Sequence, residues 1–197
     1  MRDSPVPGTQ EFFAACPRHV PDLLAAELRD LGIHVTREHP AGVGFTGPVA
    51  HAYSACLHSR TASRVLLTLG PVPLGTPESM YEALRELSWE EHLAADGTLA
   101  IDVGGEGPEG LRHSQFAAQK AKDAIVDRFR DRTGGRPSVD LASPDLRVSL
   151  RLARSQATVG IDLSGEPLSH RGYRQSSVEA PLRENLAAAL LLRCGWP

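Results

Sequence analysis

A chain of 197 residues, with 41% apolar and 23% charged residues, has the composition of a soluble globular protein of one or two domains. No apolar run approaches the roughly 20 residues that span a bilayer, and the N-terminus lacks the apolar segment of a secretory signal. We therefore expect a cytoplasmic protein with no membrane partner. The net charge of −3 is unevenly spread, because residues 111–197 hold 14 Lys and Arg against 9 Asp and Glu. This basic excess suits a nucleic-acid-binding face, although a chance asymmetry of solvated surfaces remains the alternative.

The metal-ligating residue types are scattered. Cys16, Cys56 and Cys194 lie far apart, form no CxxC pair and sit among apolar neighbours. The eight histidines show no metal-ligand spacing either. The sequence predicts three buried thiols in a reducing compartment and no metal site.

The first 70 residues alternate between strand and helix patterns. After a disordered leader (1–10), residues 12–16 form a wholly apolar strand, and a helix runs from Pro21 until Gly32 ends it. Strands at 33–38 and 43–46 precede a helix at 49–58, and a strand at 63–69 closes the series. This βαββαβ order predicts an α+β, ferredoxin-like unit over residues 11–70. The helix at 49–58 is expected to bury five side chains: Val49, Ala52, Tyr53, Cys56 and Leu57.

A second domain is expected over residues 71–165. Residues 70–77 contain two Gly and three Pro, which continue neither helix nor strand and suggest a boundary. A short helix at 78–86 follows, and Trp89 is expected to anchor the next turn, with ligand stacking as the alternative. The strand at 98–103 leads into a glycine-rich loop.

The loop from Gly104 to Gly110 matches the spacing of a dinucleotide fingerprint and resembles the S-adenosylmethionine (SAM) turn of methyltransferases. Glu106 and Glu109 argue against both, because a phosphate site favours bare amides and positive potential. A connecting loop is therefore the default, and a stand-alone SAM- or nucleotide-binding domain is the alternative.

The longest predicted helix runs from Ser114, as its cap, to about Arg132. An inward stripe comprises Ala117, Ala121, Ala124, Ile125 and Phe129. Lys120 and Lys122 are candidate phosphate contacts, although interleaved aspartates could pair with the basic residues of this helix. Arg112, at the helix entrance, is a stronger candidate because the N-terminal amides would reinforce it.

The stretch from Pro144 to Arg174 organises the chain. Strands at 145–152 and 157–163 alternate apolar and polar residues and form a hairpin, with Arg147 and Arg151 on the solvent face. A basic tail follows, in which His170, Arg171, Tyr173 and Arg174 surround a glycine. These side chains suit phosphate contacts and base stacking, although Tyr173 is about as well explained as a core residue.

Several blocks carry a family resemblance: residues 59–64, 112–116, 120–127, 144–148, 162–165 and 171–174. In this order they resemble the N-terminal region of bacterial THUMP-containing methyltransferases, which modify guanine N2 in 23S ribosomal RNA. The resemblance implies a ferredoxin-like unit, then an α/β THUMP RNA-binding domain with a mixed sheet at about residues 51–162, then a SAM-dependent catalytic domain. Its implied partners are structured ribosomal RNA and the methyltransferase domain of the same protein.

We expect that catalytic domain to lie outside this chain. Neither the glycine-rich SAM turn nor the family's Asn-Pro-Pro-Tyr motif occurs, so we expect no catalytic residue and no cofactor here, with SAM bound elsewhere in the protein. Residues 166–197 are expected to be a linker and the start of that domain. The final helix, at 179–197, is apolar on more than one side, which suits packing beneath another domain, docking on the chain's own sheet, or a protein-interaction module. The predicted RNA-binding residues are Arg112, Lys120, Lys122, Arg147, Arg151, His170, Arg171, Tyr173 and Arg174.

Overall fold

The computed structural model describes residues 8–111, 113–172, 174 and 179–196, and the chain divides into two units. The first unit comprises residues 1–67 and 163–197, and the second comprises residues 68–162. Strand β4 (Arg64–Pro73) begins in the first unit and ends in the second.

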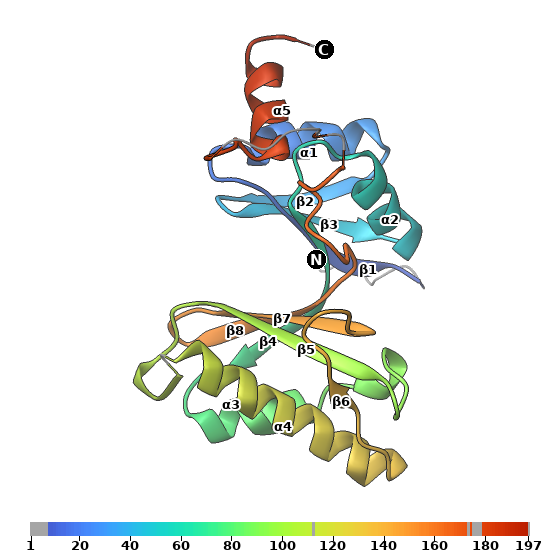
Figure 1. The fold of residues 1–197 in the computed structure, drawn as a ribbon, viewed down its shortest axis with the longest axis vertical. Coiled ribbons are helices and arrows are strands. Elements are labelled where there is room, and N and C mark those ends of the chain that lie inside the picture. Colours follow the sequence, from blue (N-terminus) through green and yellow to red (C-terminus); the bar gives the residue numbers. More distant parts are fainter. Residues whose placement is uncertain (1–7, 112, 173, 175–178, 197) are drawn as a thin grey trace, which may run out of the picture. The chain divides into compact units, whose positions relative to one another are not determined.

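The first unit is built on a four-stranded sheet in the order β2-β3-β1-β4. Its elements along the chain are β1 (Gln10–Ala15), α1 (Pro21–Asp30), β2 (His34–His39), β3 (Gly42–Gly47), α2 (Val49–His58) and the start of β4. Strand β1 lies between β3 and β4 and is antiparallel to both, and a wholly apolar sequence suits such a central position. Figure 1 shows α1 and α2 beside this sheet. The predicted βαββαβ arrangement is confirmed.

The packing of α2 differs from the prediction. Its fully buried residues are Ala52 and Ala55, whereas Val49, Tyr53 and Leu57 are 42%, 57% and 70% exposed. Two alanines allow the helix backbone to approach the sheet closely, so the larger side chains at 49, 53 and 57 occupy the outer surface. The expectation that those three side chains are buried was wrong.

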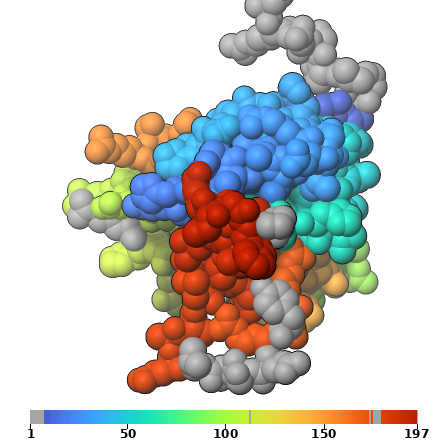
Figure 2. Space-filling model, turned by 90° about the horizontal axis from the view of Figure 1, so that it is seen from above, coloured from blue at the N-terminus to red at the C-terminus, as the bar shows by residue number. Residues whose placement is uncertain are grey.

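The described residues from 163 to 172 and from 179 to 196 belong to the first unit. Val65 N–H donates to Ser164 Oγ (2.7 Å), Leu163 N–H donates to the carbonyl of Val65 (2.9 Å), and Leu168 N–H donates to that of Ser63 (2.9 Å). Helix α5 (Glu184–Arg193) follows, and Figure 2 shows it, in red, beside the blue N-terminal segments of the same unit. Cys194, expected to be buried, is exposed, because α5 leaves much of its surface in solvent.

The second unit contains a mixed five-stranded sheet in the order β4-β8-β7-β5-β6. Strands β7 and β8 form the antiparallel hairpin, and β5 is parallel to β6 and β7. Figure 1 shows α3 and α4 together on one side of this sheet. The elements are α3 (Pro77–Arg85), the 3-10 turn η1 (Trp89–Glu91), β5 (Thr98–Gly105), the 3-10 turn η2 (Glu109–Leu111), α4 (Ser114–Thr133), β6 (Ser138–Val139), β7 (Leu146–Leu152) and β8 (Gln156–Asp162).

Two local predictions in this unit were wrong. Residues 70–73 do not break the strand, because β4 continues to Pro73. The second half of β4 lies at an edge of the sheet, where a proline can occupy a position whose N–H is not needed for pairing. Ser114 does not cap α4 with its side chain, because His113 occupies the cap position and makes no side-chain capping bond.

The core of the second unit confirms the predicted anchor. Trp89 is fully buried, and its indole N–H donates to the carbonyl of Leu84 at 2.7 Å, so ligand stacking at this residue is excluded. The five predicted inward residues of α4 are all buried. Among the described residues, no helix is both long and apolar enough to cross a membrane.

Candidate nucleic-acid interface

Strand β7 of the hairpin carries two arginines on its open face. Leu146, Val148, Leu150 and Leu152 are buried, so the alternating residues Arg147, Ser149 and Arg151 lie on the opposite face. In the register of the sheet, Arg151 lies between Gly104 of β5 and Thr158 of β8.

The two arginines differ in their partners. Arg147 Nη1 lies 3.4 Å from the carboxylate of Asp102, Nη2 donates to the carbonyl of Leu141 at 3.1 Å, and the side chain is only 21% exposed. Arg151 is exposed and has no carboxylate partner among the residues that the structure describes. Its guanidinium lies across Gly104, where an added Cβ would collide with Nη1. Arg151 therefore offers the more available charge.

The glycines of the Gly104–Gly110 loop are explained by close packing. Gly105 adopts a φ of 87°, and a Cβ there would overlap the carbonyl oxygen of Leu152. A Cβ at Gly107 would come within 3.2 Å of the Leu152 and Leu111 side chains. The loop thus packs against the end of β7, which accounts for its glycine pattern without a nucleotide.

The cations of α4 are largely paired with acids. Lys120 Nζ lies 3.4 Å from Glu78 and 5.8 Å from the centre of the Tyr81 ring, while Lys122 Nζ lies 2.8 Å from Asp123. These ion pairs reduce the positive potential that the sequence suggested along this helix.

Arg128 lies in the core rather than on the polar face of α4. Its guanidinium donates from Nε and Nη2 to Glu90 at 2.8 and 2.7 Å, and from Nη1 to the carbonyl of Arg85 at 2.9 Å. These bonds lower the pKa of the Glu90 carboxyl to about 2. The Arg128–Glu90 ion pair links α4 to the turn η1, so Arg128 has a structural role.

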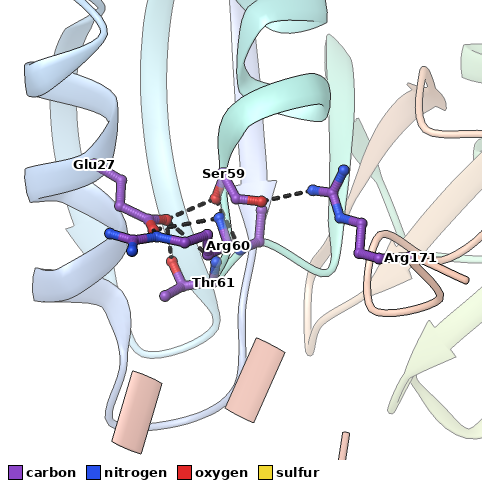
Figure 3. Close-up of polar contacts among 6 residues, drawn as sticks. Glu27, Ser59, Arg60, Thr61 and Arg171 are labelled. Atoms are coloured by element: carbon purple, nitrogen blue, oxygen red, sulfur yellow. Dashed lines mark hydrogen bonds and ion pairs between the residues drawn. The ribbon is translucent and has the colours of Figure 1, made fainter. Parts of the chain in front are cut away.

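The basic tail of the return segment is anchored to the first unit. Arg171 Nη2 donates to the carbonyl of Ser59 at 2.6 Å (Figure 3). Its Nη1 donates to the carbonyl of Leu57 at 3.3 Å. Arg174 donates to the carbonyl of Leu182 at 2.6 Å and lies 3.3 Å from Glu184. His170 is exposed. The two described arginines of this tail therefore fix its path.

A carboxylate organises the turn that follows α2. Glu27 of α1 accepts from the hydroxyls of Ser59 and Thr61 at 2.8 and 2.7 Å and from the amide of Thr61 at 3.2 Å. It also accepts from the amide and Nε of Arg60 at 3.3 and 3.2 Å, and these contacts converge in Figure 3. Ser59 and Thr61 are buried, so the sequence pattern of this turn satisfies polar groups that water cannot reach.

An open hollow of about 430 Å³ lies elsewhere in the first unit. Two of its lining residues, Arg193 and Asp22, form an ion pair in which Arg193 donates to both carboxylate oxygens at 2.6 Å. These hydrogen bonds lower the pKa of Asp22. No group of three potential metal ligands occurs among the described residues. The hollow is lined by His19, Pro21, Asp22, Glu38, His39, Pro40 and Arg193.

The predicted site residues are divided between the two units. Arg112 and Tyr173 lie outside the described residues. Lys120, Lys122, Arg147 and Arg151 belong to the second unit, whereas His170, Arg171 and Arg174 belong to the first. The prediction missed Arg154, an exposed cation in the turn between β7 and β8, although an arginine in a tight turn between two strands is visible in the sequence.

Two domain families match this chain in succession. The family model of the RlmL ferredoxin-like domain matches residues 11–66, and that of the THUMP domain matches residues 76–162. The chain contains an RlmL ferredoxin-like domain followed by a THUMP domain. Strands β1 to β4 and their helices form the ferredoxin-like domain, and the hairpin and α4 belong to the THUMP domain.

Relatives with this pair of domains are much longer. The chain is 49% identical to the ribosomal RNA large subunit methyltransferase K/L of Syntrophotalea carbinolica over 99% of its own length, but it spans only 27% of that protein. The enzyme of the same name from Pseudomonas aeruginosa is 49% identical, with 95% of this chain and 26% of the relative covered. The chain corresponds to the N-terminal part of these proteins.

Solved structures support the same fold. A putative methyltransferase complexed with SAH matches with a TM-score of 0.83 and 26% identity, covering 97% of this chain and 50% of that one. A predicted N6-adenine-specific DNA methylase from Listeria monocytogenes matches with a TM-score of 0.79 and 26% identity, covering 93% and 48%. The THUMP architecture therefore recurs in chains described as methyltransferases.

Proposed function

We propose that this chain is the RNA-binding, substrate-recognition part of a SAM-dependent 23S ribosomal RNA guanine-N2 methyltransferase. The observation that carries the proposal is the THUMP domain at residues 76–162, in a chain 49% identical to the N-terminal part of ribosomal RNA large subunit methyltransferase K/L. The chain itself is not the catalyst in this proposal. SAM binds in the remaining three quarters of the protein, and the SAH bound to the structural neighbour is the product expected of that cofactor.

The open face of the hairpin is the proposed RNA contact within the THUMP domain. Arg151 is exposed and has no described carboxylate partner, and Arg154 adds a second exposed cation in the hairpin turn. Contacts from such side chains to phosphates give affinity without sequence identity, and they position the RNA so that the catalytic domain can reach one guanine. Arg147 contributes less, because Asp102 already offsets its charge. Arg112, Lys120, Lys122, His170, Arg171, Tyr173 and Arg174 remain candidate contacts.

The stand-alone SAM-binding alternative receives no support from the geometry. Gly104 and Gly105 are required by the approach of Arg151 and of the Leu152 carbonyl. The protein-interaction alternative predicts binding that is insensitive to salt and independent of Arg151.

The test is a salt series of binding to a structured hairpin of 23S ribosomal RNA. The wild-type chain should lose affinity steeply as salt rises, and Arg151→Glu should weaken binding and reduce the log–log salt slope by about 1 or more. Arg147→Glu should have a smaller effect than Arg151→Glu. Arg29→Glu is the matched control, because Arg29 is also exposed and its substitution makes the same change in charge.

Equal losses of RNA affinity in Arg151→Glu and Arg29→Glu would show that only the net charge of the chain determines binding. That result would refute the hairpin face as the RNA contact. Absence of RNA binding by the wild-type chain and by the full-length protein at low salt would refute the proposed function. Isothermal titration with SAM should show no saturable binding to this chain, and saturable binding would favour the alternative.

A further inference from the structure

The outer face of α2 exposes an apolar stripe. Val49, Tyr53 and Leu57 follow one another at four-residue intervals, so they share one side of the helix. They are 42%, 57% and 70% exposed, and successive members lie about 6 Å apart along the axis. An exposed aromatic ring on such a face costs free energy in water unless a partner covers it.

The sequence around this stripe contains basic residues but no acidic ones. The chain contains 24 Asp and Glu residues, yet none occurs between His39 and Pro77. The same stretch contains His51, His58, Arg60 and Arg64. Helix α2 therefore carries no negative side chain, which suits a polyanionic partner.

The turn after α2 holds Arg60 in place. Only Nε of its guanidinium donates to Glu27, and the side chain is 56% exposed. Glu27 is just 12% exposed and also accepts four further hydrogen bonds from Ser59, Arg60 and Thr61. The buried carboxylate fixes the turn and leaves the two terminal nitrogens of Arg60 without a described partner.

Arg171 binds the C-terminal end of α2. It donates to the carbonyl of Ser59 (Figure 3) and to that of Leu57, which are acceptors at the C-terminal end of α2. Its positive charge offsets the negative end of the helix dipole. No carboxylate pairs with Arg171 among the described residues, and the charge of the Glu27 carboxylate at this end of α2 is offset by Arg60.

We propose that the outer face of α2 is a second RNA contact, which takes an unpaired, single-stranded segment. Tyr53 stacks on an exposed base, Leu57 packs beside it, and Arg60 contacts the phosphate backbone. The lack of acidic residues between His39 and Pro77, together with Arg60 held in place beside the stripe, favours a polyanionic RNA over a protein partner. The inference rests on the proposed RNA-binding function and adds a surface in the ferredoxin-like domain.

The test compares two probes: a 23S ribosomal RNA hairpin with a short unpaired 3′ extension that carries 2-aminopurine, and the same hairpin without the extension. Tyr53→Ala should weaken binding of the extended hairpin about 5- to 150-fold and leave binding of the hairpin without the extension unchanged, because stacking contributes about 1–3 kcal/mol per base. Tyr53→Phe should retain binding and the quenching of 2-aminopurine. Arg60→Gln should reduce the salt slope by about 1.

Leu141→Ala, which truncates a 72% exposed apolar side chain in the second unit, is the matched control. If Tyr53→Ala binds the extended hairpin like the wild type while Arg151→Glu does not, the α2 contact is refuted and the proposed function stands. If Tyr53→Ala changes sedimentation but not RNA affinity, the stripe is a protein-docking face, which also overturns the inference. A wild-type chain and full-length protein that bind neither probe at low salt refute both proposals.

Discussion

The carboxylate of Glu27 should be a major source of stability in the ferredoxin-like domain. Glu27→Ala removes the acceptor of five hydrogen bonds. Three of them come from Ser59 and Thr61, which are 1% and 0% exposed, so their donors would be left buried and unsatisfied. At about 1–2 kcal/mol for each of these three donors, the expected loss is about 3–6 kcal/mol. The two contacts from the exposed Arg60 add little.

Urea unfolding measures this loss. With a slope of about 2 kcal/mol per molar urea, the midpoint of the far-ultraviolet circular dichroism transition should fall by roughly 2 M for the ferredoxin-like part of the signal. Trp89 is buried in the second unit and Trp196 is 67% exposed, so tryptophan fluorescence reports mainly on the THUMP domain. That fluorescence transition should move less than the circular dichroism transition.

Glu38→Ala provides the matched control. Glu38 also pairs with an arginine, but the side chains of Arg29 and Glu38 are 56% and 42% exposed. Such a surface pair contributes about 0–1 kcal/mol. If Glu27→Ala shifts the midpoint no more than Glu38→Ala does, the reasoning from buried donors is refuted.

Three further predictions concern other sites. Glu90→Gln should lower the stability of the THUMP domain by about 3 kcal/mol, because buried Arg128 loses its charged partner, and an unchanged fluorescence midpoint in urea would contradict this. Because the folded pKa of Glu90 is lowered from 4.5 to about 2, its stabilisation is present above about pH 4.5 and is lost as the pH falls toward 2; the wild type and Glu90→Gln should therefore converge in acid unfolding curves. Cys194 should react first with a thiol reagent at pH 8, because it is exposed while burial raises the pKa of Cys16 to about 11. A fast reaction phase that persists in Cys194→Ser would contradict the assignment of that phase to Cys194. Gly105→Ala should destabilise the THUMP domain more than Gly134→Ala. Both glycines have positive φ, but only at Gly105 would a Cβ meet a backbone carbonyl, and equal thermal midpoints would contradict this.

The sequence by itself determined the elements whose pattern is local. The alternating leucines and arginines of β7, the apolar run of β1 and the proline at the start of α1 all predicted elements that the structure contains. Strand and helix periods depend on neighbouring residues, so no knowledge of distant contacts was needed. The blocks that resemble THUMP-containing methyltransferases are likewise a property of the sequence.

Only the tertiary structure decided which polar and apolar side chains are available. Arg128 lies outside the predicted inward stripe of α4, but it is buried in the structure, where it binds Glu90, 38 residues away. Tyr53 and Leu57 fit a buried helical stripe, but the two alanines of α2 take the sheet-facing positions. Arg171 lies in a basic tail whose partners are carbonyls 112 and 114 residues earlier. Composition cannot predict such pairings, because burial and charge compensation depend on which distant segments the fold brings together.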